Sequence, residues 1–202
     1  MFRDDVAEGG EPFALISDRL AEMPEAAPAL GKIVAEEGDE RLREAAADVL
    51  FKSDRVPVAE FAEVVFDPDV TVDLRERLIE ILSQTENIYP VLAPRMEYAE
   101  GENALILAEL LVSSGARGED VFEFLMRLTE SAETLPRALQ LIAEYGDERA
   151  LPRLYELSGT CDYALFTDIR SAVEWLGGEM DTERDWSADK TFAAIKGNKE
   201  GK

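Results

Sequence analysis

Apolar residues recur along most of this chain at the spacing of one face of an α-helix. Within residues 70–82, Leu74, Leu78, Ile81 and Leu82 follow one another at steps of four, three and one. Such steps place all four side chains on one stripe of an amphipathic helix. The same spacing occurs twice more, in Leu42, Ala46, Val49 and Leu50 and in Leu135, Leu139, Ile142 and Ala143. No segment alternates convincingly with a period of two, so the pattern predicts an all-α chain of short helices.

Short polar segments that contain glycine or proline separate these helical patterns. They are residues 37–39, 66–69, 114–118 and 145–147. Glycine and proline interrupt helices, and Asp favours turns and helix starts. We therefore expect a helix to end before each of these segments and another to begin after it.

The helical pattern repeats along the chain. In the second helix of each predicted pair, we take the residue after the first apolar residue as a reference position. These positions are Arg43, Arg75, Leu105, Pro136 and Arg170. Successive reference positions are 30 to 34 residues apart. The residues three positions later are Ala46, Leu78, Ala108, Leu139 and Val173, and those six positions later are Val49, Ile81, Leu111, Ile142 and Leu176. All ten are apolar, which predicts five helix pairs in a nearly constant register.

Three of these units resemble a known repeat family. The sequence GDERALPRLYEL at 146–157, followed by DIRSAVEWLG at 168–177, resembles a HEAT repeat of the bacterial subtype named after phycobilisome lyases (PBS lyase). Asp67–Val70 with Leu74 and Arg75 is a second match, and Asp39 with residues 42–46 is a third. The resemblance covers residues 25–177, although the third and fourth units lack the arginine at the reference position.

The resemblance implies a right-handed α-solenoid of about five HEAT-like helix pairs, in which each pair buries its apolar face against its neighbours. It also implies that Arg43, Arg75 and Arg170 pair with Asp39, Asp69 and Asp162, and that Asp69 caps a helix. Pro136 fits this scheme only in the first turn of its helix.

The ends of the chain are expected to cover the repeats. Residues 1–24 form an N-terminal segment with a capping helix at 11–22, and residues 25–177 form a single domain of repeats. Residues 178–202 hold a C-terminal cap helix, at 185–197, and a flexible basic tail. Trp186, Phe192 and Ile195 on this cap are expected to close the last repeat.

Composition narrows the function classes. Asp and Glu number 44 against 21 Lys and Arg, a net charge of −23, while 46% of residues are hydrophobic. The chain is therefore expected to fold with an acidic surface, which disfavours direct binding to nucleic acids and to anionic membranes. A single cysteine, Cys161, excludes an internal disulfide. Without a signal sequence or a spanning segment, the expected location is the cytoplasm.

Candidate catalytic chemistry is weak throughout. The chain contains no histidine, which excludes histidine-based acid–base catalysis and histidine-ligated metals. The acidic run from Asp67 to Asp73 has Val72 where an EF-hand loop requires glycine. Cys161 lies beside Asp162, whose charge disfavours a thiolate. Residues 115–118 lack the length and the Lys-Ser/Thr ending of a phosphate loop. We therefore predict no catalytic residue, cofactor or metal site.

Carboxylates that point away from the buried stripe are the candidate partner-binding residues. They lie one and five positions after the reference position or on nearby turns, and they are Glu44, Asp48, Glu76, Glu80, Glu109, Glu144 and Glu174. Like charges at i,i+4 cost a few tenths of a kcal/mol per pair. Two interpretations stay open: a solvated acidic face, or a surface that attracts a basic partner.

Trp175 lies five positions after its reference position and is the aromatic candidate. It is either an exposed anchor for a partner or packed beneath the C-terminal helix with Trp186, and the packed arrangement is favoured.

The expected function is a non-enzymatic, monomeric protein-interaction scaffold or adaptor whose acidic inner face binds a basic protein, for example as an inhibitor or immunity-like protein. Two alternatives remain. The resemblance implies a phycobilisome-lyase-like chromophore lyase or chaperone, although the fold alone does not carry that activity. The charge alone also allows an acidic DNA mimic.

Overall fold

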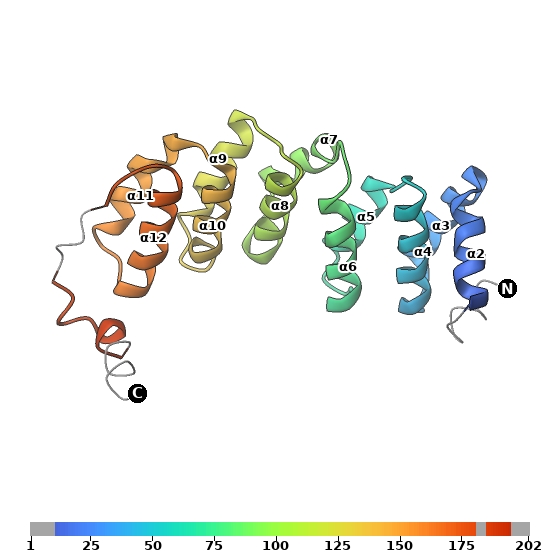
Figure 1. Cartoon of the computed structure of the whole chain (residues 1–202), viewed down its shortest axis with the longest axis horizontal. Helices are drawn as coiled ribbons and strands as arrows, with labels where there is room; N and C mark the ends of the chain where they lie inside the picture. Colours follow the sequence, from blue (N-terminus) through green and yellow to red (C-terminus); the bar gives the residue numbers. More distant parts are fainter. Residues whose placement is uncertain (1–10, 181–184, 195–202) are drawn as a thin grey trace. The chain divides into compact units, whose positions relative to one another are not determined.

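A computed structural model describes residues 11–180 and 185–194 of the chain. All regular secondary structure in these residues is helical, with no strand among them, as the sequence pattern predicts (Figure 1). The chain divides into two compact units, Met1–Glu97 and Tyr98–Lys202. The region 25–177, predicted as one domain, therefore contains the boundary between the two units.

The first unit contains two layers of helices. Its helices are α2 (Glu11–Ala21), α3 (Ala27–Glu36), α4 (Glu40–Lys52), α5 (Val58–Val65), α6 (Val72–Ser83) and α7 (Tyr89–Leu92). Helix α3 packs against α4 and α5 packs against α6, while α4 also contacts α6 and α3 contacts α5. Helix α2 lies against α4 (Figure 1). The helix predicted at 11–22 is thus present and covers the side of α4.

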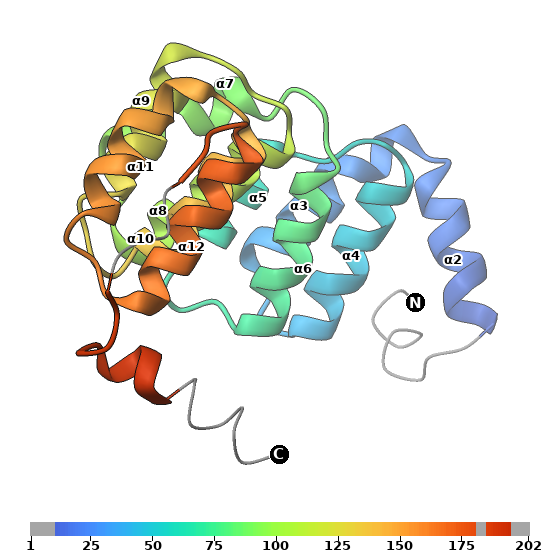
Figure 2. The same cartoon turned by 60° about the vertical axis from the view of Figure 1, so that its left-hand side comes forward.

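The second unit repeats this layering. Its helices are α8 (Gly101–Ser113), α9 (Glu119–Leu128), α10 (Leu135–Tyr145), α11 (Leu151–Ser158) and α12 (Tyr163–Trp175). Helix α10 contacts both α8 and α12, so these three form one layer (Figure 2). Helix α9 packs against α8 and α10, and α11 packs against α12.

The core follows the register of the sequence repeat. The reference positions lie on α4, α6, α8, α10 and α12, and all ten side chains three and six positions after them are at most 5% exposed. The same positions are therefore buried in the third and fourth predicted repeats, which lack the reference arginine. Pro136 lies in the first turn of α10, where the missing N–H leaves no intrahelical bond unmade.

The four predicted separating segments coincide with helix ends: 37–39, 66–69 and 114–118 lie between helices, and 145–147 begins with the last residue of α10. Asp39 caps α4 by accepting the N–H of Arg41 at 3.1 Å, and Asp162 caps α12 by accepting the N–H of Leu165 at 2.9 Å. Gly146 ends α10 in the left-handed conformation, with a φ of 76°.

The predicted cap at Asp69 is wrong. Thr71 holds the position before α6, and its side chain makes no capping hydrogen bond. The carboxylate of Asp67 instead accepts the N–H of Asp69 at 2.9 Å. Asp67 and Pro68 thus form the turn through a local side-chain bond, a role that short Asp side chains favour, and α6 begins later than the family pattern implies.

The C-terminal cap packs onto α12, although its helix begins later than residue 185. Asp189 caps residues 190–194 by accepting the N–H groups of Thr191 and Phe192 at 2.8 and 3.0 Å. Trp186 is only 8% exposed, and its ring centroid lies 4.8 Å from that of Phe166. Tyr163 contacts both Trp186 and Phe192. The expected closure by Trp186 and Phe192 is present, and Ile195 lies outside the described residues.

Candidate protein-interaction surfaces

Four of the predicted carboxylates lie on neighbouring helices of the first unit. Glu44 and Asp48 are on α4, and Glu76 and Glu80 are on α6, which packs beside α4. Glu44 is half-buried, whereas the other three are exposed. We call these four residues the α4–α6 acidic face.

Arg77 pairs with two of the four carboxylates of this face. Its Nη2 lies 2.6 Å from the carboxylate of Asp48 across the two helices, and its Nη1 contacts Glu80 on its own helix. Arg77 is not among the residues predicted from the sequence. The available signal was its position three residues before Glu80, where an i,i+3 ion pair forms within one helical turn.

Glu44 and Glu76 retain uncompensated charge, since neither makes an ion pair with any residue that the structure describes. Burial raises the pKa of the Glu44 carboxyl, and the negative charges of Glu40, Asp73 and Asp48 raise it further, whereas Arg41 lowers it. A cation from outside would relieve this repulsion.

The remaining predicted carboxylates lie in the second unit. Glu109 on α8 pairs with Arg137 on α10 at 2.9 Å, and Arg137 also donates to the Gln140 side chain. Glu174 lies 3.5 Å from Arg170 on α12. Glu144 on α10 is exposed and makes no ion pair within the described part of the chain.

Ion pairs that join neighbouring elements connect residues at similar offsets along the chain. Arg77 and Asp48 are 29 residues apart, Arg137 and Glu109 are 28 apart, and Arg149 and Glu119 are 30 apart. The pairs of Arg95 with Glu63 and of Lys52 with Asp18 span 32 and 34 residues. These offsets lie close to the 30 to 34 residues between successive reference positions.

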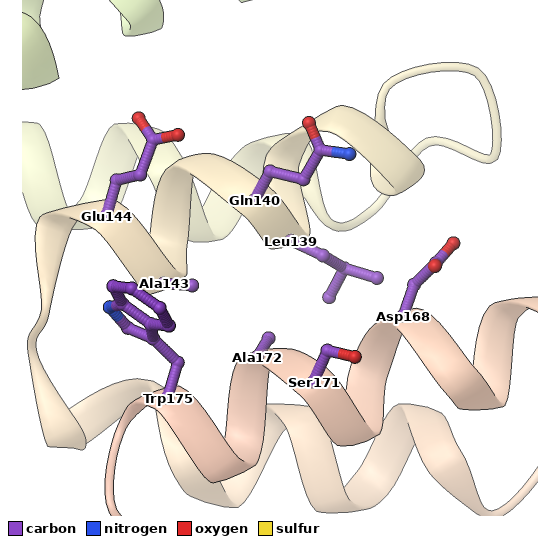
Figure 3. A pocket seen from close by; sticks show the side chains of 8 residues that line it. All are labelled: Leu139, Gln140, Ala143, Glu144, Asp168, Ser171, Ala172 and Trp175. Atoms are coloured by element: carbon purple, nitrogen blue, oxygen red, sulfur yellow. The ribbon is translucent and has the colours of Figure 1, made fainter.

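A groove between α10 and α12 is lined in part by two of the predicted residues, Glu144 and Trp175. It has a volume of about 400 Å³ and is lined by Leu139, Gln140, Ala143, Glu144, Asp168, Ser171, Ala172 and Trp175. Figure 3 shows small apolar side chains, Ala143 and Ala172, on the facing sides of the two helices, with the Trp175 indole beside Ala143. The lining includes two carboxylates and no basic side chain.

Trp175 is 75% exposed, so the favoured arrangement with Trp186 is wrong. Trp186 packs against Phe166 and Tyr163, on the N-terminal half of α12. Trp175 is the last residue of this helix, more than two turns away from that contact. Its indole therefore lies in the groove, uncovered by the C-terminal cap.

The arginines at the reference positions do not pair with the predicted aspartates. Arg43 Nε donates to the backbone carbonyl of Val34 at 2.7 Å, and Arg75 Nη2 donates to that of Asp67 at 3.0 Å. Arg170 contacts Glu174 instead of Asp162. Asp39 and Asp162 instead accept backbone N–H groups as helix caps.

The described residues offer few other candidates for catalysis or metal binding. Cys161 is half-buried and its thiol donates to the carbonyl of Ser158 at 3.4 Å. Within the described ranges, no cluster of three or more Cys, Asp or Glu side chains could hold a metal ion. None of the helices described is both long and apolar enough to cross a bilayer.

Comparison with protein-family models, with curated proteins and with solved structures gives no match. The HEAT-like assignment therefore stays a prediction. The evidence on function comes from the α4–α6 acidic face and from the groove between α10 and α12.

Proposed function

We propose that this protein is a non-enzymatic interaction module, built as a right-handed HEAT-like α-solenoid, that binds a basic protein through its acidic surface. The solenoid is supported by the constant register of buried residues and by the two-layer packing within each unit. In a solenoid, each unit packs only on its neighbours and leaves an extended surface for a partner.

The observation that carries the functional proposal is the uncompensated charge of the α4–α6 acidic face. Arg77 pairs with Asp48 and Glu80, but Glu44 and Glu76 make no ion pair with a described residue, and Arg41 only partly offsets the repulsion at Glu44. Ionised Glu44 is opposed by three carboxylates and by its own partial burial. A partner's Lys or Arg would remove this repulsion, and the chain's net charge of −23 would accelerate the encounter.

The test is partner capture by charge variants of equal net charge. The immobilised full-length chain is exposed to lysate of its source organism, washed at low and high salt, and the bound proteins are identified by mass spectrometry. The double variant Glu44→Lys/Glu76→Lys is compared with Glu36→Lys/Glu60→Lys. Glu36 and Glu60 are exposed on α3 and α5, in the other layer of the same unit.

We expect the unchanged chain and the Glu36/Glu60 variant to retain the same basic protein at low salt and lose it at high salt. The Glu44/Glu76 variant should not retain it. Equal capture by all three chains, or capture of no basic protein, would contradict the proposal.

A further inference from the structure

We propose that the groove between α10 and α12 binds an arginine side chain of a partner segment. In this arrangement the guanidinium stacks on Trp175, and the carboxylates of Glu144 and Asp168 lie at the rim of the groove. This inference rests on the proposed function in one respect, since it takes the occupant from a basic protein. It adds a second recognition site in the second compact unit, whereas the α4–α6 acidic face lies in the first.

The form of the groove suits a side chain with an apolar stem. Ala143 and Ala172 leave space between the helices, and Leu139 adds an apolar surface (Figure 3). The volume of about 400 Å³ lies within the range of small ligand sites. Arg and Lys bury their methylene groups along such surfaces while the charged head stays near water.

The charge of the groove selects a cationic head. Glu144 makes no ion pair with a described residue, and Asp168 is likewise exposed and unpaired there. The basic residues of α10 and α12 already have partners: Arg137 contacts Glu109 and Gln140, and Arg170 contacts Glu174. A neutral apolar occupant would cover both carboxylates without compensating them, a desolvation that costs free energy.

Trp175 favours arginine over lysine as this cation. Its indole is 75% exposed in the groove, a large apolar surface that the described residues leave uncovered. Trp is the strongest cation–π partner among the side chains. A planar guanidinium stacks on aromatic rings and forms bidentate bonds with carboxylates, whereas an ammonium group is a compact, strongly hydrated charge.

The chain supplies a built-in control for the test, because it has only two tryptophans and Trp186 is buried. The probe is a blocked pentapeptide, acetyl-Gly-Leu-Arg-Leu-Gly-amide, and its matched control carries neutral citrulline in place of arginine. Each peptide is titrated into the ¹⁵N-labelled full chain, and the two indole N–H signals are followed by NMR, with Trp175→Phe identifying the Trp175 signal.

We expect the arginine peptide to shift the Trp175 signal progressively and leave the Trp186 signal in place. The citrulline peptide should bind at least fivefold more weakly. Glu144→Gln and Asp168→Asn should each weaken the arginine peptide two- to fivefold, whereas Glu123→Gln, an exposed carboxylate on α9, should leave it unchanged. Trp175→Ala, followed through the Ala143 amide signal, should weaken it at least fivefold.

Equal binding of the two peptides would overturn the proposal, because charge would then play no part. Shifts of both indole signals, or of neither at millimolar peptide, would overturn it as well. A Trp175 signal that moves with protein concentration alone would assign the groove to a second copy of the chain instead.

The two proposals fail separately. If capture depends on Glu44 and Glu76 while the peptide leaves Trp175 unmoved, the proposed function stands and the groove assignment falls. If the peptide binds at Trp175 while the chain captures no basic protein, the groove assignment stands and the proposed function falls.

Discussion

Glu44 is a carboxylate whose ionisation opposes folding. Burial and the neighbouring carboxylates hold its folded-state pKa above the ordinary value of 4.5. Its favourable contribution to stability is therefore complete below the pKa of the unfolded chain, where the group is protonated in both states. That contribution is lost as the pH rises through the raised folded-state pKa.

We accordingly predict that Glu44→Gln unfolds at a higher urea concentration than the unchanged chain at pH 7. The two proteins should unfold together near pH 3.5, where Glu44 is protonated in both folded and unfolded chains. Circular dichroism at the two pH values provides the measurement. A midpoint difference of the same size at both pH values would show that the charge of Glu44 is not the cause.

Tyr145 fastens the end of α10 to the segment before α9. Its buried hydroxyl accepts the N–H of Gly118 at 3.1 Å and donates to the carbonyl of the same residue at 3.0 Å. We predict that Tyr145→Phe lowers the free energy of unfolding by about 1–2 kcal/mol, because both backbone groups lose their side-chain partner.

Tyr163→Phe is the matched control for this loss. The Tyr163 ring packs on Trp186 and Phe192, contacts that phenylalanine keeps, and its hydroxyl makes no hydrogen bond with a described residue. Urea unfolding of both variants should therefore separate the hydroxyl effect from the ring. Equal stability of the two variants would exclude the proposed role of the Tyr145 hydroxyl.

The end of α10 depends on a backbone conformation that glycine adopts freely. Gly146 has a φ of 76°, and a side chain with a Cβ is strained there. We predict that Gly146→Ala lowers the free energy of unfolding by about 1 kcal/mol in urea titrations. Gly38→Ala is the control, because the space around its Cβ position is open and its φ is not positive. A comparable loss in both variants would argue against the left-handed cap.

Helices were the part of this structure that local sequence could predict. Apolar spacing located the buried faces of α4, α6, α8, α10 and α12 because a side chain's place on a helix depends only on its position along it. The reference arginines show the limit of this reasoning. Arg43 and Arg75 donate to backbone carbonyls, and which acceptor a flexible guanidinium reaches depends on the packing of helices that the sequence pattern does not determine.

The candidate surfaces were predictable in composition more than in arrangement. Seven carboxylates were identified, but the cations that pair with two of them, Asp48 and Glu109, lie on neighbouring helices. Trp175 was identified as aromatic and placed in the wrong surroundings, since its exposure depends on where the C-terminal cap crosses α12. Both errors concern contacts between elements distant in sequence.

The unfolding of the two compact units can be followed separately. Both tryptophans lie in the second unit, so tryptophan fluorescence reports on that unit, whereas circular dichroism reports on both. Leu78 in the first unit and Leu107 in the second are fully buried, and each Leu→Ala change should cost about 2–5 kcal/mol.

We predict that Leu78→Ala introduces an earlier urea transition in circular dichroism and leaves the fluorescence midpoint in place, whereas Leu107→Ala lowers the fluorescence midpoint. Coincident midpoints from the two probes in every variant would instead indicate a single cooperative transition.

The ion pairs between helices bear on how such a chain can change in evolution. They span 28 to 34 residues, close to the 30 to 34 residues between reference positions, so the base and the acid of a pair fall in different repeats. A tandem duplication of one repeat would therefore copy only one member of each such pair. Helix α8 carries Glu109 but no basic residue, so a second copy of its repeat would need a substitution before it could form the same pair with the first.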